Sequence, residues 1–276
     1  MKHIISIFLL LGSLSAQSIA VSLAPYLNIV QEIAGPKIEV HLVVPQGASA
    51  HSFDVTPKQI QKLQEDSIWF IVGEPFESRA IKSLNKDHPR IVDLRSGLTL
   101  QEELSPCGHD HGSFDPHIWM NPEMMMIQIG TIRDALTDQF PTDSSDIYQR
   151  AENVMNKLNK LQAGVSAALS GQTGTIIVSH PAYGYLLSRY GIRQYALEFE
   201  GKEPSAKQLS QALDLIREVH ATTLFTQKQY SQKAAQRIAE ILKLKTVELD
   251  PYSSDYFTSI QHIAQAFGQE LKEAGS

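Results

Sequence analysis

The chain has 276 residues, 42% of them hydrophobic and 20% charged, which is enough apolar material for one large domain or for two lobes. Its formal charge of −6 provides no basic face to neutralise phosphates, so nucleic acid is not an expected partner.

The first residues have the pattern of a secretory signal peptide. Lys2 precedes an apolar run at residues 4–11, and small residues follow up to Ala16 and Ala20. We expect cleavage after Ala16, because cleavage after Ala20 would cut a predicted strand. No later segment approaches the roughly 18 apolar residues of a membrane span. Cys107 is the only cysteine, so no lipid-anchor cysteine follows the predicted cleavage site. We therefore expect a monomeric periplasmic protein without a lipid anchor or stable membrane insertion.

Strands and helices alternate through the next part of the chain. We expect strands at residues 19–23, 38–44, 67–72 and 90–94, and helices at residues 26–34 and 56–64. The second helix begins with a capping box, because Thr56 is the N-cap, Pro57 takes the first helical position and Gln59 the third. Apolar strands that alternate with helices predict βαβ units and a buried parallel sheet.

Two histidine-bearing segments precede the middle of the chain. Residues 106–112 form a glycine-flanked loop that carries Cys107, His109 and His111. This loop is an auxiliary metal site at best. His117 lies in a stiffer turn between two prolines, just ahead of a predicted helix at residues 123–140. A histidine in such a turn is more often structural than a metal ligand, so the rest of the chain has to decide its role.

A long amphipathic helix is expected at residues 145–169, where apolar residues recur at intervals of three and four. In mid-chain it indicates a connector packed across two α/β halves, although a long surface helix of one domain has the same pattern. The alternation then restarts. We expect strands at residues 175–178, 194–199, 223–226 and 246–249, and helices at residues 183–190, 207–220, 231–242 and 259–274.

The sequence therefore predicts an α/β fold of two lobes, each with a four-stranded, mainly parallel sheet flanked by helices, joined by one long backbone helix. The expected boundaries are a signal peptide at residues 1–16, an N-terminal lobe at 17–142, the connecting helix at 143–170 and a C-terminal lobe at 171–276.

Four candidate metal ligands share a position in this alternation: three follow a predicted strand, and the histidine at position 117 comes after the excursion of the chain that follows the fourth strand. They are His51, His117, His180 and Asp250. Parallel α/β sheets bind ligands in the crevice outside the carboxyl ends of their strands. Three imidazoles and one carboxylate suit a borderline divalent ion such as zinc. Each residue alone has a common structural explanation, so the hypothesis rests on the joint pattern.

Five motifs resemble those of the metal-binding solute-binding proteins of ABC importers for zinc and manganese. They are VPQGASAHSF at residues 44–53, DPHIWMNP at 115–122, SHPAYGYL at 179–186, EPS at 203–205 and LDP at 249–251. The resemblance spans nearly the whole mature chain. It implies two lobes joined by a rigid helix, and a metal held by His51, His117, His180 and Asp250. It also implies delivery of that metal to an ABC-type membrane permease with its ATPase.

Two features differ from the family pattern. Thr226-Gln227 stands where family members commonly have an acidic residue and a proline. The long histidine-rich loop of zinc-dedicated members is reduced here to His109 and His111, which weakens the case for zinc specificity. The resemblance implies a divalent transition metal as the transported ligand. We expect zinc ahead of manganese, because three nitrogens and one carboxylate bind zinc more tightly along the divalent series.

Two other classes of protein share parts of this pattern. A zinc hydrolase also uses three histidines and a water, but Asp250 would close the coordination sphere, and no glutamate adjoins a ligand histidine as in a zincin motif. A surface adhesin is a further alternative, which the absence of an anchoring cysteine disfavours. We therefore expect a receptor and not an enzyme.

Overall fold

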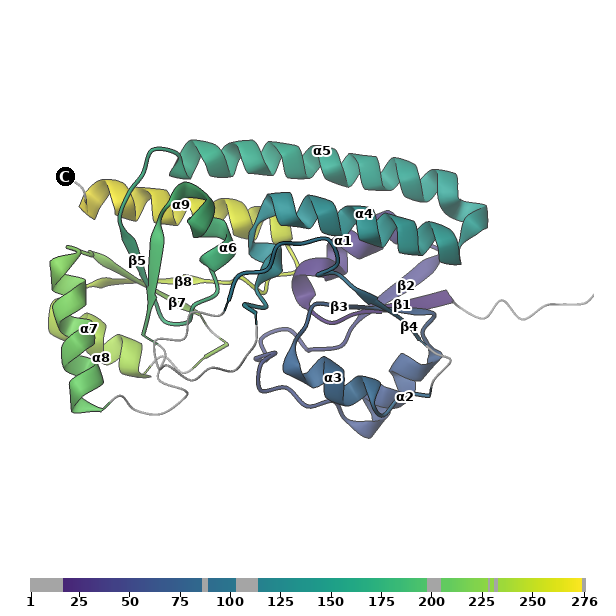
Figure 1. The fold of residues 1–276 in the computed structure, drawn as a ribbon, viewed down its shortest axis with the longest axis horizontal. Helices are drawn as coiled ribbons and strands as arrows, with labels where there is room; N and C mark the ends of the chain where they lie inside the picture. The colour runs from purple at the N-terminus through teal and green to yellow at the C-terminus, as the bar shows by residue number, and fades with distance from the viewer. Residues whose placement is uncertain are drawn as a thin grey trace, which may run out of the picture.

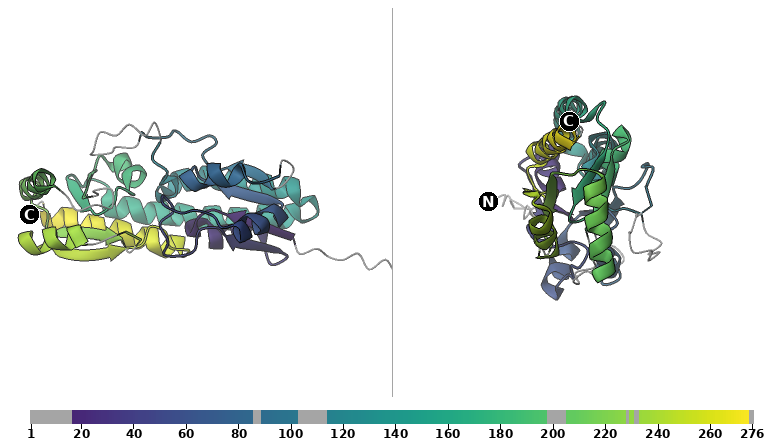
Figure 2. Two further views of the ribbon diagram at one scale, coloured as in Figure 1. Left: turned by 90° about the horizontal axis from the view of Figure 1, so that it is seen from below. Right: turned by 90° about the vertical axis from the view of Figure 1, so that its left-hand side faces the viewer.

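Two parallel sheets lie one after the other along the elongated molecule, as the computed structural model shows (Figures 1 and 2). The structure describes residues 17–85, 89–102, 114–197, 205–227, 229–230 and 233–274. The predicted signal peptide at residues 1–16, and Cys107, His109 and His111 of the predicted loop, lie outside the described residues.

The first sheet has the strand order β2-β1-β3-β4, and all its pairings are parallel. Its strands are β1 (Gln17–Val21), β2 (Ile38–Leu42), β3 (Ile68–Ile71) and β4 (Arg90–Asp93). On one side lie α1 (Ala24–Ala34) and α4 (Pro122–Gln139), and on the other α2 (Pro57–Glu65) and α3 (Pro75–Ile81) (Figure 1). Strands β1 and β3 are neighbours, and the chain passes from β1 to β2 at one edge of the sheet and from β3 to β4 at the other. Such a reversal of strand order places a ligand-binding crevice at the carboxyl ends of β1 and β3.

The second sheet repeats this order as β6-β5-β7-β8, again with parallel pairings. Its strands are β5 (Thr175–Val178), β6 (Arg193–Ala196), β7 (Thr223–Gln227) and β8 (Lys245–Leu249). Alternate residues face opposite sides, as the pleat requires. Ile176 and Val178 join the main core beside α9 (Tyr256–Ala274), whereas Ile177 packs with α7 (Ala206–Glu218) and α8 (Lys233–Leu242).

One long helix, α5 (Ser144–Leu169), runs beside both sheets and packs against α1, α4 and α9 (Figure 1). Its buried residues have the predicted spacing of three and four; they are Ile147, Ala151, Val154, Leu158, Leu161, Val165 and Leu169. Helices α5 and α9 approach each other closely at Gly268, where a Cβ would lie 2.5 Å from the backbone oxygen of Ala168. The predicted fold, with two four-stranded sheets and one long helix, is confirmed.

Several predicted boundaries differ from the structure. Helix α3 was not predicted at all. The predicted helix at residues 183–190 is a short α6 (Gly184–Leu187) followed by a 3-10 turn (Ser188–Tyr190), which Gly191 ends with φ +69°. The strand expected at residues 194–199 ends at Ala196. Helix α9 begins three residues earlier than predicted, because Asp255 accepts a hydrogen bond from the backbone N–H of Thr258 and caps the helix there.

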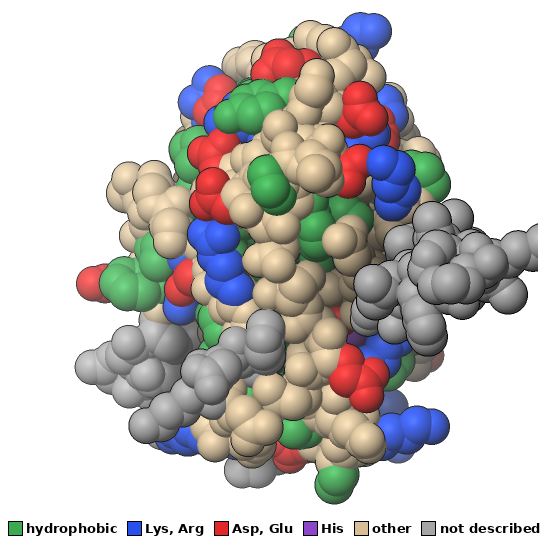
Figure 3. Space-filling model, turned by 90° about the vertical axis from the view of Figure 1, so that its right-hand side faces the viewer, with side chains coloured by type: hydrophobic (Ala, Val, Ile, Leu, Met, Phe, Trp, Pro, Cys, Tyr) green, Lys and Arg blue, Asp and Glu red, His purple; other side chains and the backbone are tan. Residues whose placement is uncertain are grey.

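The outer surface of the N-terminal lobe is mixed in charge. Figure 3 shows acidic and basic side chains interspersed over the end of the molecule that faces the viewer. In the part of the chain that the structure describes, no helix has both the length and the apolar composition that a membrane span requires.

Candidate metal centre

Three histidines from distant parts of the chain converge on one point. His51 lies in the loop after β2, His117 directly precedes the 3-10 helix η1 (Ile118–Met120), and His180 follows β5. One ring nitrogen of each histidine lies within 4.8 Å of the others. Nε2 of His180 lies 3.2 Å from Nε2 of His51 and 3.2 Å from Nε2 of His117. The structure thus brings together three of the four predicted site residues.

The spacing of these nitrogens suits a tetrahedral zinc ion. Two nitrogens that each lie about 2.0–2.1 Å from such an ion are about 3.3 Å apart. His117 and His180 are only 3% and 4% exposed, so water screens the ring nitrogens little. Lone pairs that converge on one point repel one another unless a proton or a metal cation lies between them. The arrangement is therefore chemically suited to hold a cation that accepts imidazole ligands.

Two buried carboxylates orient two of the imidazoles. Oε2 of Glu74 lies 2.8 Å from Nδ1 of His51, and Oδ1 of Asp115 lies 2.7 Å from Nδ1 of His117. A carboxylate only accepts hydrogen bonds, so each Nδ1 donates and each Nε2 keeps its lone pair for a metal. Burial alone would raise the pKa of Asp115, but its contact with His117 lowers that pKa below the usual value. Asp115 is therefore held in its charged form.

A third buried carboxylate supports the loop that carries Glu74. Glu77 accepts hydrogen bonds from the backbone N–H of Val72 at 3.0 Å and of Gly73 at 2.6 Å. Burial is the main reason why the pKa of Glu77 rises to about 7. Sequence reasoning assigned no role to Glu74, although the order strand, glutamate, Pro75 repeats the cap-and-proline signal that located α2.

Neutral groups contact His180 from the C-terminal lobe. The ring of Tyr230 stacks on its imidazole, with ring centroids 4.0 Å apart and an interplanar angle of 16°. Nε2 of Gln227, at the end of β7, donates to the backbone oxygen of His180 at 3.4 Å and to the hydroxyl of Tyr183 at 3.1 Å. The glutamine that departs from the family pattern therefore supports the backbone of a site residue.

Asp250 follows β8 as predicted, but among the described residues it is not one of the group whose ligand atoms lie within 4.8 Å of one another. Its Oδ1 accepts hydrogen bonds from Nε2 of Gln229 at 2.7 Å and from the backbone N–H of Tyr252 at 3.2 Å. The turn that it begins does reach the histidines, because the hydroxyl of Tyr252 lies 3.3 Å from Nε2 of His117. Sequence reasoning did not single out Tyr252.

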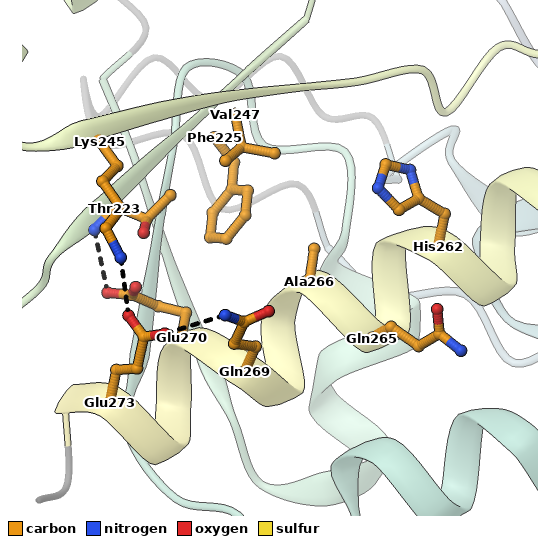
Figure 4. Close-up of a pocket in the computed structure, with 10 residues that line it drawn as sticks. All are labelled: Thr223, Phe225, Lys245, Val247, His262, Gln265, Ala266, Gln269, Glu270 and Glu273. Carbon is orange, nitrogen blue, oxygen red and sulfur yellow. Dashed lines mark hydrogen bonds and ion pairs between the residues drawn. The ribbon is translucent and has the colours of Figure 1, made fainter.

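A separate cleft of about 330 Å³ lies between β7, β8 and α9 (Figure 4). Glu270 is buried there, and its carboxylate accepts hydrogen bonds from the backbone N–H groups of Thr222 at 2.7 Å and Thr223 at 3.2 Å. Lys245 and Glu273 form an ion pair of 3.1 Å beside it. These charged groups bind one another or the backbone, so the cleft is a weaker candidate for a ligand site than the three histidines.

The chain matches the family described as "Zinc-uptake complex component A periplasmic" over residues 19–270. It is 27% identical over 253 residues to a putative metal-binding protein of Chlamydia trachomatis, covering 91% of this chain and 90% of that protein. It is 24% identical to the zinc-binding lipoprotein AdcA of Streptococcus pneumoniae, covering 86% of this chain and 50% of AdcA. A crystal structure of ZnuA superposes with a TM-score of 0.85 at 26% identity, covering 93% of this chain and 99% of that one.

These similarities distinguish between the three classes of protein considered from the sequence. The family match covers all the strands of both sheets except the first two residues of β1, and α5 lies within it. The family is one of transport receptors and not of enzymes, so neither the hydrolase nor the adhesin is favoured. The chain therefore belongs to the family of periplasmic zinc-uptake components, the metal-binding receptors of ABC importers.

Proposed function

We propose that this receptor binds one divalent transition-metal ion through Nε2 of His51, His117 and His180 and a carboxylate oxygen of Asp250, and that it prefers zinc to manganese. The observation that carries the proposal is the 3.2 Å spacing of the ring nitrogens, which suits two ligands of one tetrahedral ion. Asp250 is included because it begins the turn whose Tyr252 hydroxyl reaches His117. Rotation of the Asp250 side chain away from Gln229 would bring a carboxylate oxygen to the ion while Tyr252 stays packed against Trp119.

Capture of the ion needs no covalent chemistry. Glu74 and Asp115 accept hydrogen bonds from the Nδ1–H groups of His51 and His117, which leaves both Nε2 lone pairs available to replace water on the ion. Acidification protonates the imidazoles and weakens binding. Zinc is preferred because affinity for nitrogen ligands rises along the divalent series from manganese towards copper and zinc.

The loaded receptor then delivers its ion to a membrane permease, which an ATPase powers. Membership of the receptor family supports this step. We propose that the receptor acts as a monomer. Its attachment to the membrane, or lack of it, stays a prediction from the sequence that cell fractionation tests.

The test is a metal titration of the purified mature protein. We expect one zinc ion per chain and, in competition with a chelator of known affinity, tighter binding of zinc than of manganese. His180→Ala should abolish measurable competition, whereas His262→Ala, which changes a histidine in the cleft of Figure 4, should bind zinc like the wild type. Displacement of equimolar zinc by manganese would contradict the preference, and unchanged binding by His180→Ala would contradict the site.

A further inference from the structure

Aromatic rings enclose the three histidines. Tyr230 stacks on His180 and lies 6.2 Å from the His51 ring, centroid to centroid. The ring centroids of Trp119 and Tyr252 lie 5.3 Å and 6.3 Å from that of His117. Tyr252 is 6% exposed and Trp119 is fully buried. Large apolar rings therefore occupy space around the ring nitrogens that solvent would otherwise fill.

Tyr252 reaches the side of His117 on which a metal would bind. The Nδ1 atom of that imidazole is engaged by Asp115, and the Tyr252 hydroxyl lies 3.3 Å from the opposite nitrogen, Nε2. In the absence of a metal, the hydroxyl can donate a hydrogen bond to the Nε2 lone pair. With an ion on Nε2, the same hydroxyl would lie beside the coordination sphere.

Tyr252 is also fixed in place. Its backbone N–H donates to Oδ1 of Asp250 at 3.2 Å, and the indole N–H of Trp119 donates to the backbone oxygen of Pro251 at 2.8 Å. Its ring packs against that of Trp119 with centroids 5.2 Å apart. Trp119 lies two residues after His117, so these contacts fix the position of Tyr252 relative to that histidine.

We propose that Tyr252 is a specificity-determining residue of this receptor: it excludes water from the coordination sphere and so limits the bound ion to four protein ligands. This inference rests on the proposed function, in which the histidines hold the ion. Zinc is satisfied by four ligands in a tetrahedron. Manganese and magnesium favour octahedral coordination by oxygen, and magnesium usually keeps several of its waters. A tyrosine that excludes water therefore lowers the affinity for manganese and magnesium and leaves the affinity for zinc unchanged.

The experiment compares zinc and manganese dissociation constants for wild type, Tyr252→Phe and Tyr252→Ala. In Tyr252→Ala we expect the preference for zinc to fall by at least about tenfold, chiefly because water that enters the site completes the coordination of manganese. Tyr252→Phe removes only the hydroxyl and should give a smaller change in the same direction. The matched control is Tyr26→Phe, which removes a buried hydroxyl that donates to Gln128 in the N-terminal core.

Cobalt(II) gives a second readout that does not depend on affinity. Its visible absorption is strong when four ligands surround it in a tetrahedron and weak when six do. Wild type should give the strong spectrum, and Tyr252→Ala the weaker spectrum of a site that has admitted water. Tyr252→Phe keeps the ring in the core, so this variant tests the role of Tyr252 if the alanine variant does not fold.

The outcomes separate this inference from the proposed function. Wild type that binds zinc, with variants that keep both the zinc preference and the cobalt spectrum, would overturn the role of Tyr252 and leave the histidine site intact. Wild type that binds no metal would overturn both.

Discussion

The two halves of the site are built differently. The N-terminal lobe supplies His51 and His117, and each of these donates to a buried carboxylate, at 2.8 Å and 2.7 Å. The C-terminal lobe supplies His180, which stacks on Tyr230. Hydrogen bonds to a charged acceptor are shorter and about twice as strong as neutral ones. Charged acceptors therefore orient both histidines of the N-terminal half.

This difference suggests that the N-terminal half governs affinity for the ion and that the C-terminal half completes the site. Carboxylate partners raise the basicity of an imidazole and fix its orientation, so His51 and His117 are prepared to bind before any ion arrives. The carboxylate of Asp250 accepts hydrogen bonds from the side chain of Gln229 and from the backbone N–H of Tyr252. We expect this C-terminal half to adjust when the ion binds.

The largest effect should come from removing a ligand. We expect His117→Ala and His180→Ala each to weaken zinc binding by more than about 100-fold, beyond the effect of changes outside the ligands. His117→Ala should also destabilise the metal-free protein by about 1–3 kcal/mol, because buried Asp115 loses its side-chain partner. Zinc competition and urea unfolding measure the two quantities. Equal losses of stability in both variants would remove the distinction between the halves.

The carboxylates should have the next largest effect. Glu74→Gln and Asp115→Asn keep the shape of each side chain but weaken its hold on Nδ1, so we expect zinc affinity to fall by about 10–100-fold. Asp138→Asn is the matched control, because Asp138 pairs with Arg90 on the surface at 3.5 Å. Titration of the three variants under one condition checks this. Losses below threefold at both site carboxylates would show that they do not prepare the N-terminal half.

Glu77, in the N-terminal half, should make the stability of the protein depend on pH. Its pKa of about 7 in the folded protein exceeds the ordinary value of 4.5, so the native state binds more protons between these values. Stability should therefore fall as pH rises through this window, by about 2 kcal/mol between pH 5 and 7. Glu77→Gln should lack this contribution. Urea unfolding of the metal-free proteins at pH 5, 6 and 7 tests this prediction. If the free energy of unfolding changed with pH equally in wild type and variant, the prediction would be wrong.

The predicted loop at residues 106–112 should matter least. His109→Ala with His111→Ala should leave zinc affinity within about tenfold, because glycine-flanked residues lose about 1–2 kcal/mol each in backbone entropy when they become ordered around a metal. Competition titration of the double variant checks this. A larger loss would mean that a third segment contributes to the site beside the two halves.

Much of the fold could be predicted because local signals and burial agree. The capping box at Thr56 and Gln59 begins α2 as expected, and the apolar spacing in α5 matches its buried face. Helix α3 was missed because it has only seven residues, Pro75–Ile81, too few for a helical period to be recognised. The early start of α9 depends on one hydrogen bond of Asp255, a signal that is weak in the sequence.

The site was less predictable than the fold. His51 and His180 could be found because each follows a strand, and parallel strands bring their carboxyl ends together. His117 could be found from its stiff turn between two prolines. Glu74 and Tyr252 could not, since their roles depend on distances across the fold. Tyr252 approaches His117 from 135 residues away, and no local pattern encodes that contact. The place of Asp250 in the coordination sphere stays a prediction.

The hydrophobic core does not follow the boundary between the lobes. One cluster runs from β1 and β3 through α4, α5 and α9 to β5, while a smaller cluster joins one face of the second sheet to α7 and α8. Cooperative unfolding units follow shared burial and not chain order. The molecule should therefore melt as one body that spans both lobes, and α7 and α8 are the layer able to detach first. Helix α5 is a shared part of the core, and an N-terminal lobe cut from it would expose α1 and α4, so we expect that lobe not to fold alone.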